Sequence, residues 1–266
     1  MANVFTETRI TFSPYLAIGA ERIGPPALVL ISFVIAWQFS SEWFGTPEYL
    51  FPPPSDFLGR FVTDRGALAY NFATTGYVVL VGFAVATLIA IPLGLAIASY
   101  SSLRRNLFPI VVFFEIIPKT ITAPLLVVWF GIGFAPRIGL TVIMTFFPIL
   151  VNAIAGFSSL NPRLQLITKS MGASSWQTFR FIRLPAAMPY IFAGMKIGMV
   201  MAVTAAITAE FIGANDGLEK LILSAGDYMD ISLMFAGIIA TALLATLLTG
   251  LLLGLEKVMM PWRRNL

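Results

Sequence analysis

Residues 161–185 read NPRLQLITKSMGASSWQTFRFIRLP, a polar and basic connection between two long apolar stretches of the chain. Asn161 and Pro162 predict a helix start, because an Asn side chain accepts backbone N–H groups at an N-cap and proline fits the first helical position. Gly172 predicts the end of that helix, since glycine readily takes the left-handed conformation of a C-cap. The apolar residues of one helical face are Leu164, Ile167 and Met171.

A second short helix is expected after Gly172, with Ser174 or Ser175 as its N-cap. Its apolar positions are Trp176, Phe179 and Ile182. We expect Pro185 and Pro189 to break this helix before the next apolar stretch, because proline has no backbone N–H to donate. Residues 161–185, called the elbow below, thus form a helix–glycine–helix unit with a basic and aromatic exterior. A simple loop between two apolar stretches would not require two capped helices. The pattern therefore predicts a docking element for a cytoplasmic partner.

The composition around the elbow indicates a membrane protein. The chain has 266 residues, of which 58% are hydrophobic and 11% charged, and its mean hydropathy is +0.87. Soluble chains carry about 25% charged residues, so a water-soluble domain is excluded as the main class. A bilayer-spanning helix needs about 20 mostly apolar residues. The sequence therefore predicts an all-α integral membrane fold with six transmembrane helices, at about 25–42, 70–99, 108–130, 137–157, 187–211 and 231–255.

The basic residues predict the orientation of these helices. With both termini in the cytoplasm, eleven of the 17 basic residues fall on the cytoplasmic side and four on the outer side. Cytoplasmic loops carry the excess of Lys and Arg in membrane proteins, so this orientation is favoured. The expected organisation is a cytoplasmic segment at 1–23, a transmembrane domain at 24–256 that contains the elbow, and a cytoplasmic tail at 257–266.

Several function classes are excluded by missing residue types. The chain has no Cys and no His, so disulfides, thiolate or imidazole metal sites and His-dependent catalysis are all unavailable. The net charge of +4 reflects the cytoplasmic bias of a membrane protein, and we expect no nucleic-acid partner. An intramembrane enzyme would need a Ser–Lys dyad on Lys119 or Lys196, and no serine is suitably placed beside either lysine.

Four charged residues lie within the predicted spans, where an ionisable group is expensive and commonly functional. Glu115 and Lys119 are four residues apart and share a helix face next to Pro118, so that helix is expected to be interrupted. They are candidates either for a polar wall of a translocation path or for a pair that cancels both charges. Lys196 either lines the path or extends toward the membrane surface, and Glu210 is either a gate or an interfacial residue.

The elbow resembles the cytoplasmic signature of binding-protein-dependent ABC importer permeases, written EAA-x3-G-x9-I-x-L-P. Gly172, Ile182, Leu184 and Pro185 fall at the required spacing, whereas Leu166-Ile167-Thr168 stands in place of Glu-Ala-Ala. Further segments are similar to the nitrate, sulfonate and taurine group of these permeases. They are FPPPS at 51–55, Ile117-Pro118, Pro124-Leu125 with WFGIG at 129–133, and AEFIGA at 209–214 with Gly217-Leu218. Glu219 departs from the glycine common in that group.

This resemblance implies a transport subunit rather than an enzyme. Two copies of the chain would form the path in the cytoplasmic (inner) membrane of a bacterium, and a periplasmic or lipid-anchored solute-binding protein would deliver the solute. Two cytoplasmic ATPase subunits would receive the elbow and bind ATP and Mg²⁺, because this chain has no phosphate-binding G-x-x-x-x-G-K-[ST] loop and no cofactor of its own. The implied ATPase-coupling residues are Leu166, Thr168, Gly172, Ala173, Ser174, Ile182, Leu184 and Pro185.

The solute stays open at this point. A sulfonate-, taurine- or nitrate-like anion and a heteroaromatic vitamin precursor both fit the resemblance. The two basic residues within the predicted spans, Lys119 and Lys196, favour a small anion or a zwitterion. A stand-alone channel or secondary carrier is the alternative, and the capped basic elbow argues against it. The expected path residues are Glu115, Lys119, Lys196 and Glu210.

Overall fold

The structure is a computed structural model that describes residues 28–40, 43, 45, 47 and 50–262. Every labelled element of these residues is a helix. An apolar helix at Leu28–Gln38 comes first. The labelled helices are α3 (Pro54–Thr63), α4 (Arg65–Ser99), α5 (Ser101–Ile116), α6 (Lys119–Phe130), α7 (Phe134–Ser158), α8 (Pro162–Ser170), α9 (Ser175–Thr178), the π-helical turn η1 (Phe179–Arg183), α10 (Leu184–Gly213), α11 (Leu218–Asp227) and α12 (Ile231–Met259).

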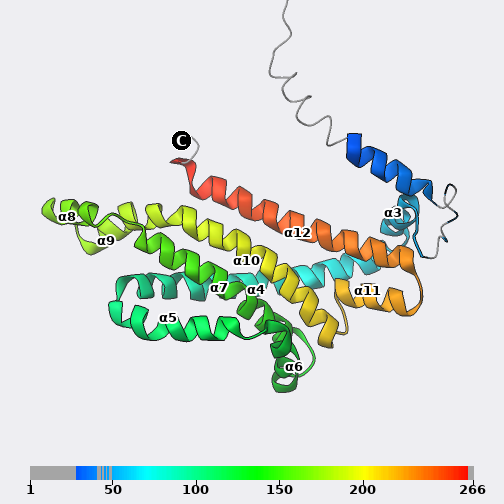
Figure 1. Cartoon of the computed structure of the whole chain (residues 1–266), viewed down its shortest axis with the longest axis horizontal. Coiled ribbons are helices and arrows are strands. Elements are labelled where there is room, and N and C mark those ends of the chain that lie inside the picture. The colour runs from blue at the N-terminus through cyan, green and yellow to red at the C-terminus, as the bar shows by residue number, and fades with distance from the viewer. Residues whose placement is uncertain (1–27, 41–42, 44, 46, 48–49, 263–266) are drawn as a thin grey trace, which may run out of the picture.

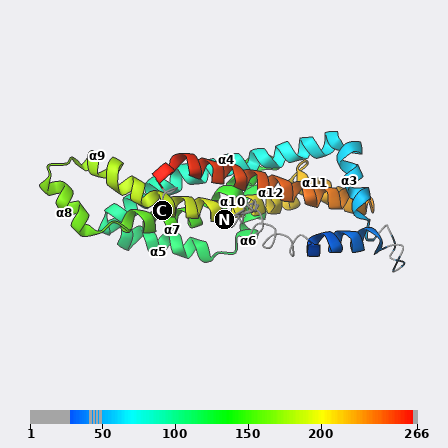
Figure 2. The same ribbon diagram turned by 90° about the horizontal axis from the view of Figure 1, so that it is seen from above.

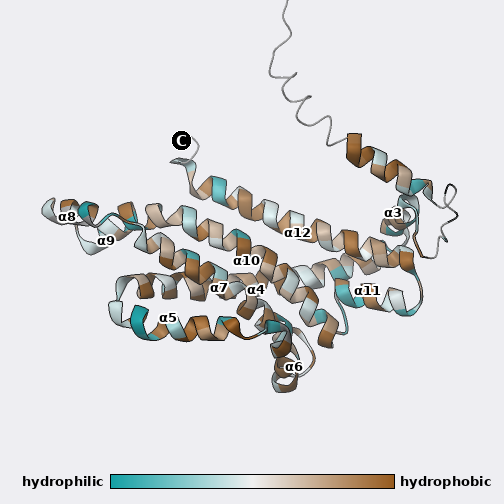
Figure 3. Ribbon diagram, in the orientation of Figure 1, coloured by the Kyte–Doolittle hydropathy of each residue, from teal (hydrophilic) through white to brown (hydrophobic). Residues whose placement is uncertain are grey.

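The long helices run roughly along one axis of an elongated molecule (Figure 1). Helices α8 and α9 project at one extremity, the elbow end, and α3 and α11 lie at the other, the α11 end. Both views agree on this arrangement (Figure 2). The turn between α4 and α5 and the end of α12 point toward the elbow end (Figures 1 and 2). Apolar residues cover the long helices, and hydrophilic ones gather mainly near helix ends (Figure 3).

The centre of the molecule is a close packing of α7 against α4 and α10. Glycines allow this approach: a Cβ on Gly94 of α4 would lie 2.7 Å from the Cβ of Ala153, and one on Gly194 of α10 would lie 2.6 Å from the Cβ of Asn152. A Cβ on Gly198 would meet Ile149 at 2.9 Å. Small residues are how membrane helices gain close van der Waals contact. Gly254 of α12 has no atom within 4 Å of such a position. The close contacts of Gly94, Gly194 and Gly198 belong to α4 and α10, and Gly254 does not contribute one within this chain.

The described residues contain four or five of the six predicted spans. Four stretches are long and apolar enough to cross a membrane: α4, α7, α9 to α10 taken together, and α12. Helices α5 and α6 make a fifth if the bent pair counts as one span. The predicted first span, 25–42, corresponds to the 11-residue helix Leu28–Gln38, and its outer residues 25–27 and 41–42 lie outside the described part. Six spans are therefore not confirmed.

The predicted span at 108–130 is two helices with an angle of 100° between them. The break falls at Ile117 and Pro118, whose backbones are extended, with ψ of 125° and 114°. Pro118 cannot donate a helical hydrogen bond, and the residue before a proline is driven out of the helical region. The interruption expected from Pro118 is thus present, and it takes the form of a sharp bend.

The expected break at Pro185 and Pro189 is wrong. Helices α9, η1 and α10 form one continuous apolar stretch, Ser175–Gly213. Pro185 occupies the first turn of α10, where its missing N–H costs little, and the π-helical turn before it shifts the hydrogen bonding so that the N–H of Leu184 reaches the carbonyl of Phe179. Pro189 lies inside α10 without ending it.

The domain limits lie partly beyond what is described. The segment 1–23 falls outside the described residues, and α12 continues to Met259, two residues past the start of the expected tail at 257.

Candidate functional site

The elbow folds locally much as its sequence suggests. The side chain of Asn161 accepts the N–H of Arg163 at 3.0 Å at the start of α8. Gly172 has φ +72°, and the N–H of Ala173 donates to the carbonyl of Thr168 at 3.0 Å, which closes the end of that helix. Ser174, rather than Ser175, caps α9: its hydroxyl accepts the N–H of Gln177 at 3.2 Å, and the Gln177 side chain accepts the N–H of Ser174 at 2.8 Å. This reciprocal capping box fixes the second helix.

The elbow exposes an apolar surface at its tip. Met171 is 80% exposed and Trp176 is 64% exposed. Other exposed apolar side chains of the elbow are Leu164, Ile167 and Phe181. A patch of this kind that projects from the body of a protein commonly marks a contact with a partner.

The second half of the elbow is anchored to the end of α7. Trp176 stacks on Phe179 with ring centroids 5.6 Å apart, and Phe179 stacks on Phe157 of α7 at 6.4 Å. The guanidinium of Arg183 lies 5.8 Å from the Phe157 ring, and its Nε donates to the Phe157 carbonyl at 3.4 Å. Movement of α9 would therefore be transmitted to α7 and, through the continuous helix, to α10.

The predicted coupling residues occupy distinct positions in this unit. Thr168 is buried, Ser174 and Gly172 are exposed, and Ala173 is half-buried. The side chain of Leu166 lies outside the described residues. Ile182 of η1 and Leu184 and Pro185 at the start of α10 are half-buried.

The broken helix carries the first pair of predicted path residues. The Lys119 ammonium lies 2.5 Å from Oε1 of Glu115 and also donates to the Glu115 carbonyl at 2.9 Å. Lys119 thereby bonds a carbonyl near the C-terminus of α5, where a cation interacts favourably with the helix dipole. The hydroxyl of Thr122 donates to the Lys119 carbonyl at 2.6 Å. These groups line a cavity of about 340 Å³ between α5, α6 and α7.

The other two predicted path residues, Lys196 and Glu210, do not line that cavity. The Lys196 ammonium is 2.6 Å from Oε2 of Glu256, so this ion pair links α10 to the last turns of α12. Glu210 is only 1% exposed and lies near the opposite end of α10. The four residues therefore do not form one cluster.

Glu210 belongs to a hydrogen-bonded network that holds the connection between α10 and α11. Thr75 of α4 donates its hydroxyl to Oε1 of Glu210 at 2.7 Å and accepts the N–H of Leu218 at 2.9 Å. The N–H of Glu219 donates to Oε2 of Glu210 at 3.1 Å. Asn71, also on α4, accepts the N–H of Gly217 at 2.7 Å. Both carboxylate oxygens of Glu210 are thus used within the chain.

Arg137 completes this network, and sequence reasoning missed it by counting it as an outer-loop residue. It is buried near the start of α7, its Nη2 lies 2.9 Å from Oδ1 of Asp216, and its Nη1 donates to the Asp216 carbonyl at 3.1 Å. The hydroxyl of Tyr70 donates to the other carboxylate oxygen of Asp216 at 3.1 Å. Burial also raises the pKa of the nearby Glu219 carboxyl above its ordinary value. No local sequence signal pairs Arg137 with Asp216.

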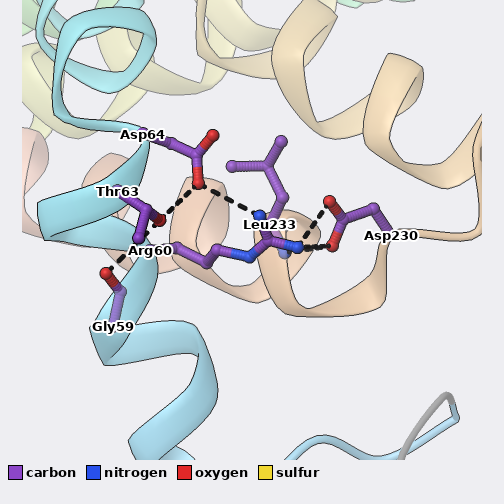
Figure 4. Close-up of polar contacts among 6 residues, drawn as sticks. All are labelled: Gly59, Arg60, Thr63, Asp64, Asp230 and Leu233. Atoms are coloured by element: carbon purple, nitrogen blue, oxygen red, sulfur yellow. Dashed lines mark hydrogen bonds and ion pairs between the residues drawn. The ribbon is translucent and has the colours of Figure 1, made fainter.

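A second polar cluster at the α11 end joins α3 to α12 (Figure 4). Nη2 of Arg60 donates to both carboxylate oxygens of Asp230 at 2.7 Å, and Nη1 donates to Asp64 at 3.2 Å. Asp230 also accepts the N–H of Leu233 at 3.2 Å, which caps α12. The same carboxylate therefore fixes a helix start and a contact between helices.

Comparisons with known proteins agree with this geometry. Residues 90–260 match the family described as "Binding-protein-dependent transport system inner membrane component". The chain is 30% identical to the formylaminopyrimidine transport permease protein ThiX of Halalkalibacterium halodurans, over 90% of this chain and 96% of that protein. It is 32% identical to the riboflavin transport system permease protein RibX of Chloroflexus aurantiacus, over 92% and 94% of the two chains. It is also 32% identical to the taurine transport system permease protein TauC of Escherichia coli, over 90% and 88%.

The fold is also that of a solved transporter. A structure of the inward-facing MetNI methionine ABC transporter superposes with a TM-score of 0.62 at 19% identity, covering 75% of this chain and 97% of that one. Long apolar helices, a projecting capped elbow and these relatives lead to one assignment: the chain belongs to the binding-protein-dependent transport system inner membrane components, the multi-pass permeases of ABC importers.

Proposed function

We propose that this chain is the transmembrane permease subunit of an ATP-driven importer, in which two copies form the path of a small solute. The observation that carries the proposal is the elbow: a doubly capped unit with exposed Met171 and Trp176 at its tip, joined without a break to α10. A surface of that kind suits a groove on an ATPase, and its continuity with a span provides a mechanical connection.

The charges support a cytoplasmic position for the elbow end. Basic residues of the described chain that lie in or beside the elbow or at the start of α5 are Arg104, Arg105, Arg163, Arg180 and Arg183. Acidic residues of α3, α11 and their neighbouring turns lie at the α11 end, and they are Asp56, Asp64, Asp216, Glu219, Asp227 and Asp230. Cytoplasmic segments of membrane proteins carry an excess of Lys and Arg, so this charge distribution also supports a cytoplasmic position for both termini.

The partners follow from this orientation. Two cytoplasmic ATPase subunits bind ATP and Mg²⁺ and receive the elbow through the coupling residues Leu166, Thr168, Gly172, Ala173 and Ser174. Ile182, Leu184 and Pro185 connect the elbow to α10. A solute-binding protein docks at the α11 end and delivers the solute. ATP-driven movement of the elbow then exchanges inward-open and outward-open arrangements of the helices.

We assign different roles to the four intramembrane charges. Glu115 and Lys119 line the path at the broken helix, where irregular backbone at membrane depth is tolerated because it faces a cavity. Lys196 holds α10 to α12 through Glu256, and Glu210 holds the α10–α11 connection. The relatives are named for the transport of formylaminopyrimidine, riboflavin and taurine, so we infer that the solute of this chain is a small organic molecule of this range.

An Ala173→Asp variant tests the coupling role. Ala173 is half-buried at the turn between α8 and α9, so a carboxylate there disturbs docking while the spans stay intact. The tagged chain is purified from its own membranes in mild detergent, and co-purifying ATPase and ATP-dependent solute uptake are measured. We expect about a tenfold loss of both for Ala173→Asp. Ser102→Asp is the matched control, because Ser102 is exposed in the first turn of α5 at the same end of the molecule. This variant should keep normal ATPase recovery and normal uptake.

Two results would contradict the proposal. One is normal ATPase recovery and uptake with Ala173→Asp. The other is a chain that purifies without any ATPase and still carries solute in liposomes, which would make it a carrier or a channel.

A further inference from the structure

The cavity at the broken helix has the size of a ligand site. It measures about 340 Å³ and lies between α5, α6 and α7. Pockets for small molecules are commonly about 300–1,000 Å³, are mostly apolar, and carry a few polar groups that orient the ligand. This cavity matches that description with respect to both volume and lining.

Three phenylalanines contribute to its walls. Phe114 of α5 and Phe146 and Phe147 of α7 line it together with aliphatic side chains. Phenyl rings gain most from flat π systems that stack or meet them edge to face. A small inorganic anion or an aliphatic sulfonate has no such surface, and transferring its charge from water to an apolar wall is costly.

The charges of the cavity cancel each other. The Lys119 ammonium uses one donor on the Glu115 carboxylate and another on the Glu115 carbonyl. An incoming anion would therefore meet a neutralised pair instead of an open cation, and it would have to compete with a carboxylate 2.5 Å from the ammonium. Among the described residues, one donor of the ammonium and one oxygen of the Glu115 carboxylate take part in no other hydrogen bond, and they match the donor and acceptor edge of a heterocycle.

We propose that this cavity binds a flat, uncharged heteroaromatic solute, stacked on Phe146 and Phe147 with its polar edge on the Glu115–Lys119 pair. The inference rests on the proposed function, because it treats the cavity as a solute-binding site on the transport path. Relatives with heteroaromatic and aliphatic solutes are equally similar to this chain, at 32% identity for RibX and TauC alike, so overall similarity does not decide between the two classes. The phenylalanines and the neutralised ion pair of the cavity favour the heteroaromatic class.

Binding is measured on the permease–ATPase complex in lipid nanodiscs, without nucleotide and without the solute-binding protein. The probe is lumichrome, a fluorescent flat tricycle without the sugar-alcohol chain of riboflavin. We expect saturable quenching of lumichrome fluorescence, and displacement by an uncharged aminopyrimidine. Taurine and nitrate should need at least a hundredfold higher concentration than the aminopyrimidine to displace it.

Variants test the position and the chemistry of the site. Phe146→Leu and Phe147→Leu should each weaken lumichrome binding about tenfold, because each removes one ring from the stack. Phe211→Leu is the matched control: Phe211 is 61% exposed on α10 and does not line the cavity, so binding should be unchanged. Glu115→Gln leaves the Lys119 ammonium without its carboxylate, and taurine and nitrate should then compete at lower concentration than in the unaltered protein.

Equal displacement by taurine or nitrate in the unaltered protein would overturn the proposal, and so would equal losses for Phe146→Leu and Phe211→Leu. These outcomes are separate from failure of the proposed function. That failure appears as absence of a co-purifying ATPase or as ATP-independent uptake, and it is recorded before any lumichrome is added.

Discussion

Gly217 is the point at which the network around Glu210 depends on a single backbone conformation. Its φ is +119°, a region that residues with a side chain rarely adopt. A Cβ at this position would collide with the Glu210 carboxylate. The carboxylate can therefore receive the N–H of Glu219 and the hydroxyl of Thr75 only because position 217 has no side chain.

We predict that Gly217→Ala lowers the free energy of unfolding by roughly 2–4 kcal/mol, as backbone strain adds to a displaced buried carboxylate. Thermal unfolding in detergent measures the change. Gly250→Ala is the control, because Gly250 is helical and has no atom within 4 Å of the added methyl group. Equal melting temperatures for Gly217→Ala and the unaltered protein would disprove the steric argument.

At the scale of elements, single carboxylates join helices that are distant in the sequence. Asp230 caps α12, and both of its carboxylate oxygens accept Nη2 of Arg60 from α3, 170 residues away (Figure 4). The ion pair is partly exposed, with 34% of the Arg60 side chain and 29% of the Asp230 side chain accessible, so solvent screens it. The cap and the ion pair are thus separate contributions from one side chain.

We predict that Asp230→Ala costs about 1–2 kcal/mol and Arg60→Ala about 0.5–1 kcal/mol, because only the first change also removes the N-cap. Asp230→Asn keeps a capping oxygen and should resemble Arg60→Ala. Chemical denaturation in detergent gives the three values, and a double-mutant cycle of Arg60 and Asp230 gives their coupling. A larger loss for Arg60→Ala than for Asp230→Ala would show that the cap contributes nothing.

At the scale of the whole molecule, close approach of α7 to α4 and α10 determines how the spans are arranged. Gly94 of α4 meets Ala153, and Gly194 and Gly198 of α10 meet Asn152 and Ile149. Since lipid tails are as apolar as the helix surfaces, this van der Waals contact is a main source of helix association in a membrane. The elbow is joined directly to these helices, because it continues into α10 and packs on the end of α7.

We predict that Gly198→Val separates α10 from α7 and yields little monodisperse protein, as measured by size-exclusion chromatography in detergent. Gly254→Val is the matched control: it adds the same isopropyl side chain to a helical glycine that has open space around it within this chain. Comparable aggregation of both variants would mean that helix propensity, rather than the α7–α10 contact, explains the loss.

Much of the elbow could be predicted because its signals are local. Gly172 has the positive φ expected of it, and Ser174 provides one of the two caps considered. The break expected at Pro185 was wrong, because a π-helical turn accommodates the proline and no residue pattern announced that turn. The six predicted spans are confirmed only in part, because the first of them is an 11-residue helix whose predicted ends lie outside the described residues. Pro118 announced the interruption of the third span, but the 100° angle between its two helices depends on tertiary packing.

The sequence by itself determined the solvent class, the long apolar helices, the elbow and its caps, because each depends on residue type within a local stretch of chain. It also determined which chemistries are absent, through the lack of Cys and His. It did not reveal the short helices α3 and α11. Only the tertiary structure decided that Arg137 meets Asp216, that Thr75 and Glu210 hold the α10–α11 connection, and that phenylalanines of two helices enclose the Glu115–Lys119 pair. These contacts join residues that are far apart in the chain, and their distances depend on how whole helices pack, which no local pattern encodes.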